Sequence, residues 1–582
     1  MANERIIPSE TAKSSCTYTI ISEGNAVSKT YHLLGLTVQK EVNRITSATI
    51  VFADGSTAKE SFGISNQEDF LPGQTIEIKL GYKAVEKTVF KGVVIKQSIK
   101  IREGGSSLVV ECRHTAYQMT LTPKAKYFHD MKDSELMEEL ISLYGIENDI
   151  EATAFKNLQM VQYHATDWDF MLIRADINGY ICVTNDEKII IKKPDLSAAP
   201  ALEIQYGATI YELDAEIDAR LQMDKVIAKT WNPANQELDD QVEGDEPSLE
   251  EAGNVAASNL AERMGAISYN LVHGGFIQEE EAKEWVNAKL AKHRLAKIKG
   301  TVTTDGIADV NPGQFIKING IGERFSGKLF VTGVTHLLED GKWLTTFQFG
   351  LNTNWFTEQF TVSQPLAAAQ LPAVQGLHVG KVTALEGDPD EEQRIQVVIP
   401  EIMKDDEGTW CRVCTLDAGE DRGTFFLPEI NDEVIVGFVN NDPRFGIVLG
   451  MLHSSHNPAP FNASDDNHQK GYTSRSKMRL HFDDDKNSIL IDTPEGNSIL
   501  MAKDEGITIS DQHGNKIVMN TDGILFESSK NITIKCDADF KSESGMNTEI
   551  KASAGATFKG QAQTELSASG TLTIKGAIVN IN

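Results

Sequence analysis

The chain has 582 residues, and its 55 Lys and Arg against 84 Asp and Glu give a formal net charge of −29. At about 150 residues per domain, this length predicts roughly four domains, which excludes a single small catalytic unit as the whole function. The negative charge excludes a role that depends on a generic basic surface for nucleic acid or membrane lipid.

The N-terminal sequence and the cysteines indicate a compartment. The first ten residues, MANERIIPSE, are charged and contain no apolar segment, so we expect no Sec-type signal peptide and synthesis that ends in the cytosol. Six cysteines are too few for a disulfide scaffold in a chain of this length, and reduced thiols fit the same compartment.

Residues 1–120 predict a β-rich unit. Apolar and polar residues alternate in TIEIKLGY from Thr75 and in SLVVECRH from Ser107, and REGG from Arg102 supplies a hairpin turn between strands. This part of the chain therefore predicts antiparallel strands rather than helices.

Helical signals follow in the middle of the chain. Ser134 and Asp167 each precede an amphipathic run that ends at a glycine, which predicts two helices. A third helix is expected from Glu279 to about Lys297, because acids fill its first turn and bases its last, as the helix dipole favours. Residues 237–251 hold eight acidic and no basic residues and predict a solvated loop.

An internal repeat brackets this helical middle. FLPGQTIEIKLGY with FKGVV (Phe70 to Val94) resembles VNPGQFIKINGIG with FSGKLFVTGV (Val310 to Val334). Each copy has a Pro-Gly-Gln turn, a strand that alternates Ile with polar residues, and a second strand that Phe-x-Gly opens. We interpret residues 1–360 as one region with two related β-barrels, at about 1–120 and 210–355.

A linker and a smaller barrel are expected next. Residues 361–375 contain prolines and glutamines, which favour a linker over a membrane-spanning helix. Residues 376–460 predict short strands and turns of a small barrel of the OB type. With six basic and sixteen acidic residues, this barrel would repel a phosphate backbone, so we expect no nucleic-acid partner.

After a connector over 461–487, residues 488–582 contain no Trp, Tyr or Arg. Apolar residues nevertheless recur at spacings of eight to ten, which is not expected of a disordered low-complexity tail. One chain offers too few inward side chains per repeat to enclose a core, so we predict a trimeric, intertwined β-helix needle. Its expected core residues are Ile499, Ile507, Ile517, Ile524, Ile532, Ile534, Phe540, Ile550, Phe558, Leu566 and Ile574.

Candidate reactive groups are weak. Cys411 and Cys414 have metal or redox spacing, but in a strand the two sulfurs would point to opposite faces. His453, His456, His468 and His481, and the acidic run Asp483 to Asp485, favour loops and a turn over metal or acid sites. The chain contains no G-x-S-x-G, H-E-x-x-H, P-loop or G-x-G-x-x-G pattern, and we expect no catalytic residue, metal or cofactor.

In this order, the parts resemble the VgrG spike family of contractile injection systems, which is equivalent to a fusion of the phage hub and spike proteins. QYHATDWDFMLIRADING (Gln162 to Gly179) is similar to the family's hub motif, and FFLPEINDEVIVGFVNNDPRFGIVLG (Phe425 to Gly450) to its OB-fold signature. SRSKMRLHFDDDKNSILI resembles the entry to the needle. Asn431 stands where Gly is usual, and Phe445 where Pro is common.

The resemblance implies a non-enzymatic homotrimer at the tip of a contractile machine. Its partners would be the hexameric inner-tube protein, baseplate proteins, a PAAR-type tip protein and effector cargo. The machine would assemble in the bacterial cytoplasm and eject the spike on contraction. Three copies of the chain end would form a platform with open backbone edges for the tip protein. The residues expected there are Ile578, Val579, Asn580, Ile581 and Asn582.

Two other function classes remain open at this stage. The first is a β-helical tailspike enzyme that degrades polysaccharide, although a rod without Trp or Tyr offers a poor sugar-binding surface. The second is an adhesin fibre, which needs an exposed binding head at its end. Turnover of peptidoglycan or capsule by the pure protein would favour the enzyme.

Overall fold

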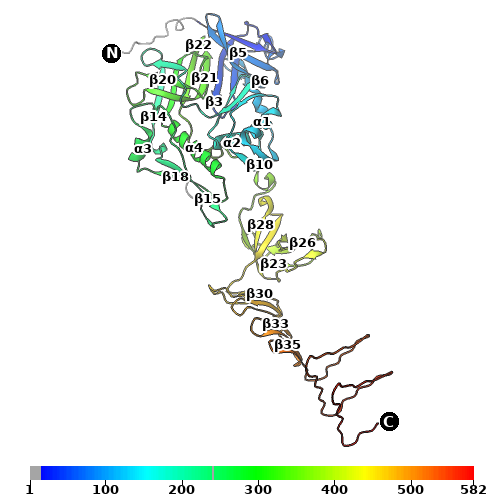
Figure 1. The fold of residues 1–582 in the computed structure, drawn as a ribbon. Helices are drawn as coiled ribbons and strands as arrows, with labels where there is room; N and C mark the ends of the chain where they lie inside the picture. The colour runs from blue at the N-terminus through cyan, green and yellow to red at the C-terminus, as the bar shows by residue number, and fades with distance from the viewer. Residues whose placement is uncertain (1–14, 239–241, 582) are drawn as a thin grey trace. The chain divides into compact units, whose positions relative to one another are not determined.

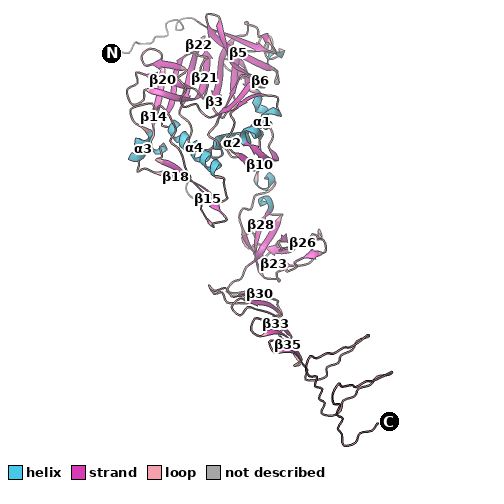
Figure 2. Ribbon diagram, viewed as in Figure 1, coloured by secondary structure: helices cyan, strands magenta, loops and turns pink. Residues whose placement is uncertain are grey.

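The computed structural model describes residues 15–238 and 242–581, and it divides into two compact units. The first unit is Met1–Val374 with Asn440–Pro443, and the second is Gln375–Val439 with Arg444–Asn582. Both are built mainly from β-strands, and the helices belong to the first unit (Figures 1 and 2). Within the described residues, no helix has the length and apolar character needed to cross a bilayer.

The first unit, here called the hub, is organised around one sheet of 13 strands. Its main path runs in the order β14 (Glu212–Ile217), β19 (Ile298–Asp305), β22 (Lys342–Phe349), β21 (Gly327–Glu339), β3 (Leu33–Glu41), β4 (Ser47–Ala53), β7 (Gly105–Arg113), β6 (Val85–Arg102), β5 (Thr75–Tyr82), β1 (Cys16–Ser22) and β2 (Asn25–Ala26). A side branch pairs β13 (Leu202–Gln205) with β20 (Phe315–Asn319), and β20 with β21.

The two copies of the repeat have the same local geometry. In each Pro-Gly-Gln turn the glycine has a positive φ, 104° at Gly73 and 90° at Gly313, as a type II turn requires. The Gly73 N–H donates to the Val94 carbonyl at 2.8 Å, and the Gly313 N–H donates to the Val331 carbonyl at 2.8 Å. Each turn leads into an antiparallel pair, β5 with β6 and β20 with β21, so the prediction of a repeat is confirmed locally.

The two related halves each have a core of their own, and their strands join into one continuous sheet. One core includes Leu36, Ile50 and Phe90, and the other includes Val302 and Phe347. The halves join because β21 runs beyond β20, and its remaining length pairs with β3 of the first half. Such a join depends on long-range strand pairing that local sequence patterns do not specify.

The predicted helices are present. Helix α1 is Asp133–Ser142, α2 is Asp167–Ile177 and α4 is Glu279–Leu295; two shorter helices are α3 (Ala257–Arg263) and α5 (Phe356–Gln359). Ser134 lies in the first turn of α1 rather than at its cap, where the Lys132 N–H donates to the Glu135 carboxylate. Thr166 caps α2 by accepting from the Asp169 N–H. Helices α1 and α2 thus lie between the two halves of the sheet, α3 and α4 lie within the second half between β14 and β19, and α5 follows the second half.

Smaller β elements accompany these helices. β8 (Lys124–Lys132) pairs with β10 (Lys156–Ala165), and β9 (Glu147–Ile150) and β11 (Ile181–Asn185) flank β12 (Lys188–Lys192). β15 (Lys225–Asn232) pairs with β16 (Glu237–Leu238), β17 (Val242–Glu243) and β18 (Ser268–His273).

The acidic stretch 237–251 is only partly the solvated loop that its composition predicts. Residues 239–241 lie outside the described residues, and the remainder approaches α4. Glu246 accepts from the buried guanidinium of Arg294 at 2.6 and 2.8 Å, and Glu251 pairs with the buried Lys297. The acids therefore neutralise bases that the fold has removed from water.

The second unit begins with a closed five-stranded barrel, as predicted. Its order is β23 (His378–Ala384), β24 (Ile395–Val398), β25 (Thr409–Val413), β29 (Gly446–Met451) and β28 (Glu433–Phe438), around a core rich in valine. A short hairpin joins β26 (Ala418–Gly419) and β27 (Arg422–Gly423). Asn431 adopts a left-handed φ of 76°, which explains how it replaces glycine.

A seven-stranded antiparallel meander follows, here called the spike sheet. Its strands are β30 (Gln469–Thr473), β31 (Arg479–Asp483), β32 (Ser488–Asp492), β33 (Ser498–Ala502), β34 (Gly506–Ser510), β35 (Lys516–Asn520) and β36 (Gly523–Glu527). It begins within the expected connector, because β30 and β31 pair in register with β32. The structure assigns no strand to residues 528–581, so the intertwined β-helix stays a prediction.

Candidate assembly interface

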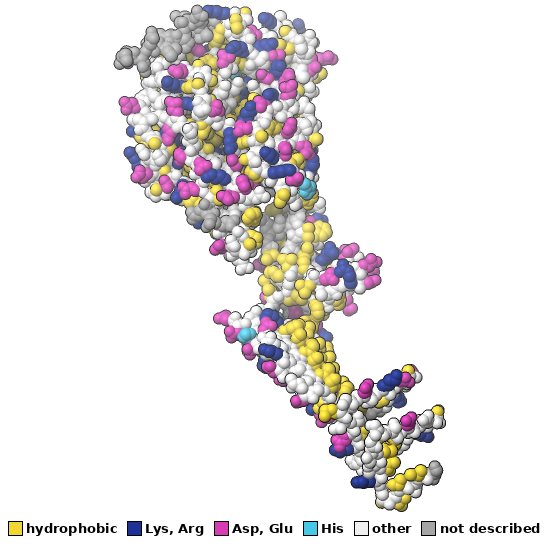
Figure 3. Space-filling view, viewed as in Figure 1, with side chains coloured by type: hydrophobic (Ala, Val, Ile, Leu, Met, Phe, Trp, Pro, Cys, Tyr) yellow, Lys and Arg dark blue, Asp and Glu magenta, His cyan; other side chains and the backbone are white. Residues whose placement is uncertain are grey.

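The spike sheet presents one nearly continuous apolar face. Alternate residues of a strand share a face, and the antiparallel register aligns them into cross-strand columns. One column holds Tyr472, Leu480, Ile491, Ile499, Ile509, Ile517 and Phe526, and the second holds Phe482, Ile489, Met501, Ile507, Met519 and Ile524 after Lys470. These thirteen apolar residues are called the apolar face below, and Figure 3 shows hydrophobic side chains gathered along this sheet.

The apolar face is incompletely covered in the single chain. Nine of its thirteen side chains are at least 38% exposed, and Ile524 and Phe526 reach 66% and 61%. A contiguous exposed patch of this kind is rare on monomeric proteins and marks an interaction site. The arrangement can therefore bury further apolar area only by association.

The structure gathers four predicted core residues on this face, Ile499, Ile507, Ile517 and Ile524. The sequence prediction took one residue per strand from β33 to β36 and so missed Met501, Ile509 and Met519 on the same strands. Each of these stands two positions from a residue that the spacing had identified, so strict alternation within each strand is the signal that would have found them.

The opposite face of the spike sheet is mixed. Its outer column carries polar groups that interact across strands: Arg479 donates to Asp492 at 2.9 Å, and the Ser498 and Ser510 hydroxyls lie 2.7 Å apart. The guanidinium of Arg479 lowers the pKa of the Asp492 carboxyl, through a hydrogen bond. Polar ladders of this kind suit a surface that remains in water.

Beyond the sheet, the remaining predicted core residues are exposed. Between 59% and 70% of each residue's surface is accessible at Ile532, Ile534, Phe540, Ile550, Phe558, Leu566 and Ile574. The structure does not bring these residues together into a core within one chain. Their joint burial between chains stays a prediction.

The expected tip residues are also accessible where they are described. Ile578 is 81% exposed, Val579 48% and Ile581 86%, and Asn580 is exposed as well. Asn582 lies outside the described residues. The chain end thus offers apolar side chains without covering them itself.

The weak reactive candidates have structural surroundings. Cys411 is buried in β25, and this burial raises the pKa of its thiol to about 11. Cys414 is exposed, which agrees with the expectation that the two sulfurs point to opposite faces. Asp483 accepts from the Lys486 N–H and so closes the predicted turn. Across residues 15–238 and 242–581, no group of three or more His, Cys, Asp or Glu side chains could hold a metal ion.

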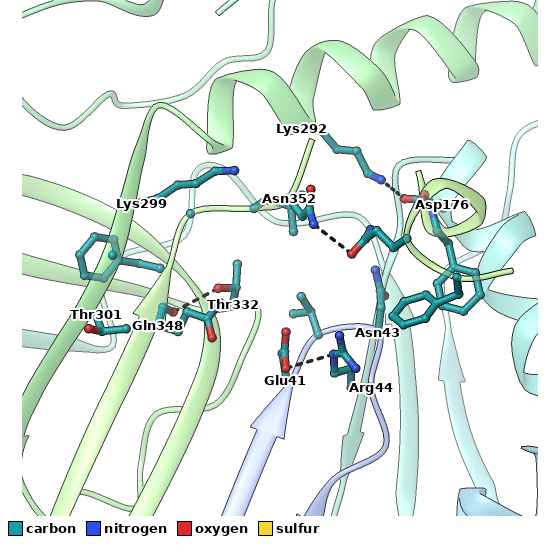
Figure 4. Close-up of a pocket in the computed structure, with 18 residues that line it drawn as sticks. Glu41, Asn43, Arg44, Asp176, Lys292, Lys299, Thr301, Thr332, Gln348 and Asn352 are labelled. Atoms are coloured by element: carbon teal, nitrogen blue, oxygen red, sulfur yellow. Dashed lines mark hydrogen bonds and ion pairs between the residues drawn. The ribbon is translucent and has the colours of Figure 1, made fainter. Parts of the chain in front are cut away.

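The hub contains a cavity of about 410 Å³ between β3, β19, β22 and α4 (Figure 4). The polar side chains around it interact mainly with one another: Lys292 pairs with Asp176 at 2.5 Å, Arg44 with Glu41 at 3.2 Å, and Asn352 donates to Gln359. Burial lowers the pKa of Lys292. This network closes the junction between sheet and helices.

Comparisons with known proteins agree with this division of the chain. Residues 12–340, more than half of the chain, match the Alg8 N-terminal domain. Residues 378–453, which include the closed barrel, match the type VI secretion system/phage-baseplate injector OB domain.

Similar individual proteins come from contractile systems. The type VI secretion system spike protein VgrG1b of Pseudomonas aeruginosa is 21% identical over 70% of this chain and 57% of its own length. VgrG1a of the same organism is 21% identical over 70% of this chain and 66% of its own length. The chain thus spans about three fifths of these relatives. A solved structure of Escherichia coli c3393, a type VI component, is 12% identical, covers 74% of this chain and 99% of its own, and has a TM-score of 0.38.

Proposed function

Because the chain belongs to the VgrG spike family of contractile injection systems and carries the Alg8 N-terminal domain, we propose that it is the non-enzymatic hub and spike at the tip of such a machine. The hub couples to the inner tube, and the spike is driven through a target envelope on contraction. A tailspike enzyme or an adhesin fibre has no observation in its favour.

The observation that carries this proposal is the apolar face of the spike sheet. Three copies that turn this face toward a shared axis would bury it jointly and leave the polar ladders in water. The seven predicted core residues that follow Phe526, from Ile532 to Ile574, would continue the same core. In this proposal, domain boundaries fall at 1–360 for the hub, 361–375 for the linker, 376–460 for the OB barrel and 469–582 for the spike.

The proposed partners follow from the same architecture. Two related halves per hub in a homotrimer give six similar units, which would suit a hexameric tube protein. The open chain end would receive a PAAR-type tip protein, and baseplate proteins and effectors would bind elsewhere on the assembly. We propose assembly in the bacterial cytoplasm and release on contraction.

Two measurements test the proposal. The mass of the purified chain in solution should be three times 64.0 kDa, the mass of one copy. In cells that make the machine, deletion of the gene should abolish assembled particles in electron micrographs and delivery of effectors. A stable monomer, or intact and active machines without this protein, would contradict it.

A further inference from the structure

The hub sheet leaves two strand edges open. Within the described residues, β14 pairs with β19 alone, at one end of the sheet. β6 pairs with β7 along one edge, whereas its other edge is covered by β5 only as far as Val93. Residues 96–102 of β6 therefore present a second unpaired edge, far from β14 in the strand order (Figure 1). Such edges are templates for another strand.

The repeat identifies what covers the equivalent edge in the second half. β6 corresponds to β21, because Val94 and Val331 bond to equivalent turns and both strands bulge at the next residue, Ile95 or Thr332. Lys96–Arg102 thus corresponds to Gly333–Glu339. That second segment is not open, since β3 pairs along its whole length.

The two segments differ in burial as well as in pairing. His336 and Leu338 are 1% and 3% exposed beneath β3. Their counterparts Ile99 and Ile101 are 47% and 66% exposed. The first half therefore lacks the strand that the second half receives.

The strand equivalent to β3 is β14. β3 pairs with β4, which pairs with β7, and β14 pairs with β19, which pairs with β22. The register of these pairs agrees as well. In the first half, Ala48 of β4 lies opposite Val38 on one side and Cys112 on the other. In the second half, Gly300 of β19 lies opposite Ala215 and Phe349 in the same way. Val38 thus corresponds to Ala215. The neighbour that β6 lacks therefore has an equivalent on every chain, namely β14 at the opposite end of the same sheet.

We propose that β14 of one chain pairs with residues 96–102 of β6 on the next copy and closes the hub into a ring. This deepens the proposed function, on which it rests, by specifying the contact between protomers. The contact is head-to-tail, so each copy gives one strand and receives one, as a closed cyclic assembly requires. It repeats between chains the β3–β21 pairing that joins the halves within a chain.

The register carried over from β3 and β21 makes the two edges complementary. Of seven opposed pairs, three join opposite charges and two join apolar residues, and the other two, Gln97 with Ile217 and Ser98 with Glu216, contain no like charges. The charged pairs are Lys96 with Asp218, Lys100 with Asp214 and Arg102 with Glu212, and the apolar pairs are Ile99 with Ala215 and Ile101 with Leu213. The acidic side chains of β14, Glu212, Asp214 and Glu216, are exposed, and Leu213 and Ala215 face the second core, so the pairs within β14 fall on the correct face. Asp218 lies just after β14 and bonds to Arg220, and Lys96 pairs with Glu111, so the pair of Lys96 with Asp218 would extend two ion pairs already present.

Disulfide trapping tests this register on the full chain with Cys414 and Cys536 changed to Ser. Directly opposed residues have Cα atoms about 4.5 to 5.5 Å apart, within the range of a disulfide. Ile99→Cys with Ala215→Cys should give covalent trimers on a gel without reductant. The control, Ile99→Cys with Leu213→Cys, places the thiols on the same face but diagonally, and should cross-link about ten-fold less.

A charge exchange provides a second readout. Lys100→Asp or Asp214→Lys alone should speed hydrogen exchange of the amides of residues 96–102 roughly ten-fold, and the two together should restore protection. A trimer by mass that shows no cross-link, or equal cross-linking in the control, overturns this contact and leaves the proposed function standing. A chain that is monomeric by mass removes both.

Discussion

Replacement of a single residue on the apolar face tests whether that face is the trimer core. Ile509 lies on β34 and is 39% exposed in the single chain. Full burial of an isoleucine contributes about 1.5 to 3 kcal/mol, so covering the remaining 39% contributes roughly 0.6 to 1.2 kcal/mol per chain and about 2 to 3.5 kcal/mol for three.

Ile509→Asp removes this burial and adds three carboxylates near one axis. The effective cost of desolvating each charge is several kcal/mol, and like charges repel. The total penalty therefore exceeds about 5 kcal/mol, which would raise the dissociation constant by at least about a thousand-fold. We expect the variant to lose the trimer at micromolar concentration in analytical ultracentrifugation, with its far-UV circular dichroism unchanged.

The next residue provides the matched control. Ser510 lies on the opposite face of the same strand, beside Lys516, and bonds only to the Ser498 hydroxyl. Ser510→Asp adds the same charge where water and a lysine can accommodate it, and should leave the trimer intact. If both variants remain trimers of equal stability, the apolar face is not the core.

Two further predictions concern the tip and the hub. Deletion of Gly576–Asn582 should abolish capture of a PAAR-type tip protein in a pull-down and leave the trimer intact; undiminished capture would place the docking site elsewhere. Burial lowers the pKa of His336 to about 3 and of His114 and His293 to about 4. Because these folded-state values lie below the unfolded value of about 6.5, stability is complete above about pH 6.5 and falls as the pH drops toward 4, by roughly 2 kcal/mol per histidine at pH 5. The loss of melting temperature between pH 7 and pH 5 should be smaller in His336→Gln than in the parent, and equal losses would contradict this origin.

Sequence reasoning succeeded where local chemistry decides the structure. The Pro-Gly-Gln turns needed only a positive φ at Gly73 and Gly313, and α4 needed only its charge gradient. Sequence reasoning identified only part of the two apolar columns of the spike sheet, because a spacing of eight to ten residues detects one residue per strand.

Long-range pairing was beyond the same reasoning. Nothing local in β3 specifies β21 as its neighbour rather than a strand of its own half, so the continuous sheet was missed. Glu246 and Glu251 were assigned to solvent because the buried bases that they neutralise lie more than 40 residues away, in and just after α4. Residues 528–581 are almost entirely exposed in one chain, so contacts within the chain do not define their packing, and in the proposed trimer the other copies would supply it.

In the proposed assembly, one polypeptide forms both a hub ring of six similar units and a spike of three copies. Each hub carries the strand unit twice, and its open edges have opposite charge, so three chains joined through β14 and β6 would alternate internal and intermolecular copies of one contact around a ring of six. The spike sheet occurs once per chain, and in the proposed trimer its apolar face would be buried against the two other copies. The step from six units to three therefore falls between the last hub strand, β22, and the OB barrel, where the chain passes through residues 361–375. One linker per chain is sufficient for this change from six units to three, because both copies of the repeat lie before the linker in the sequence.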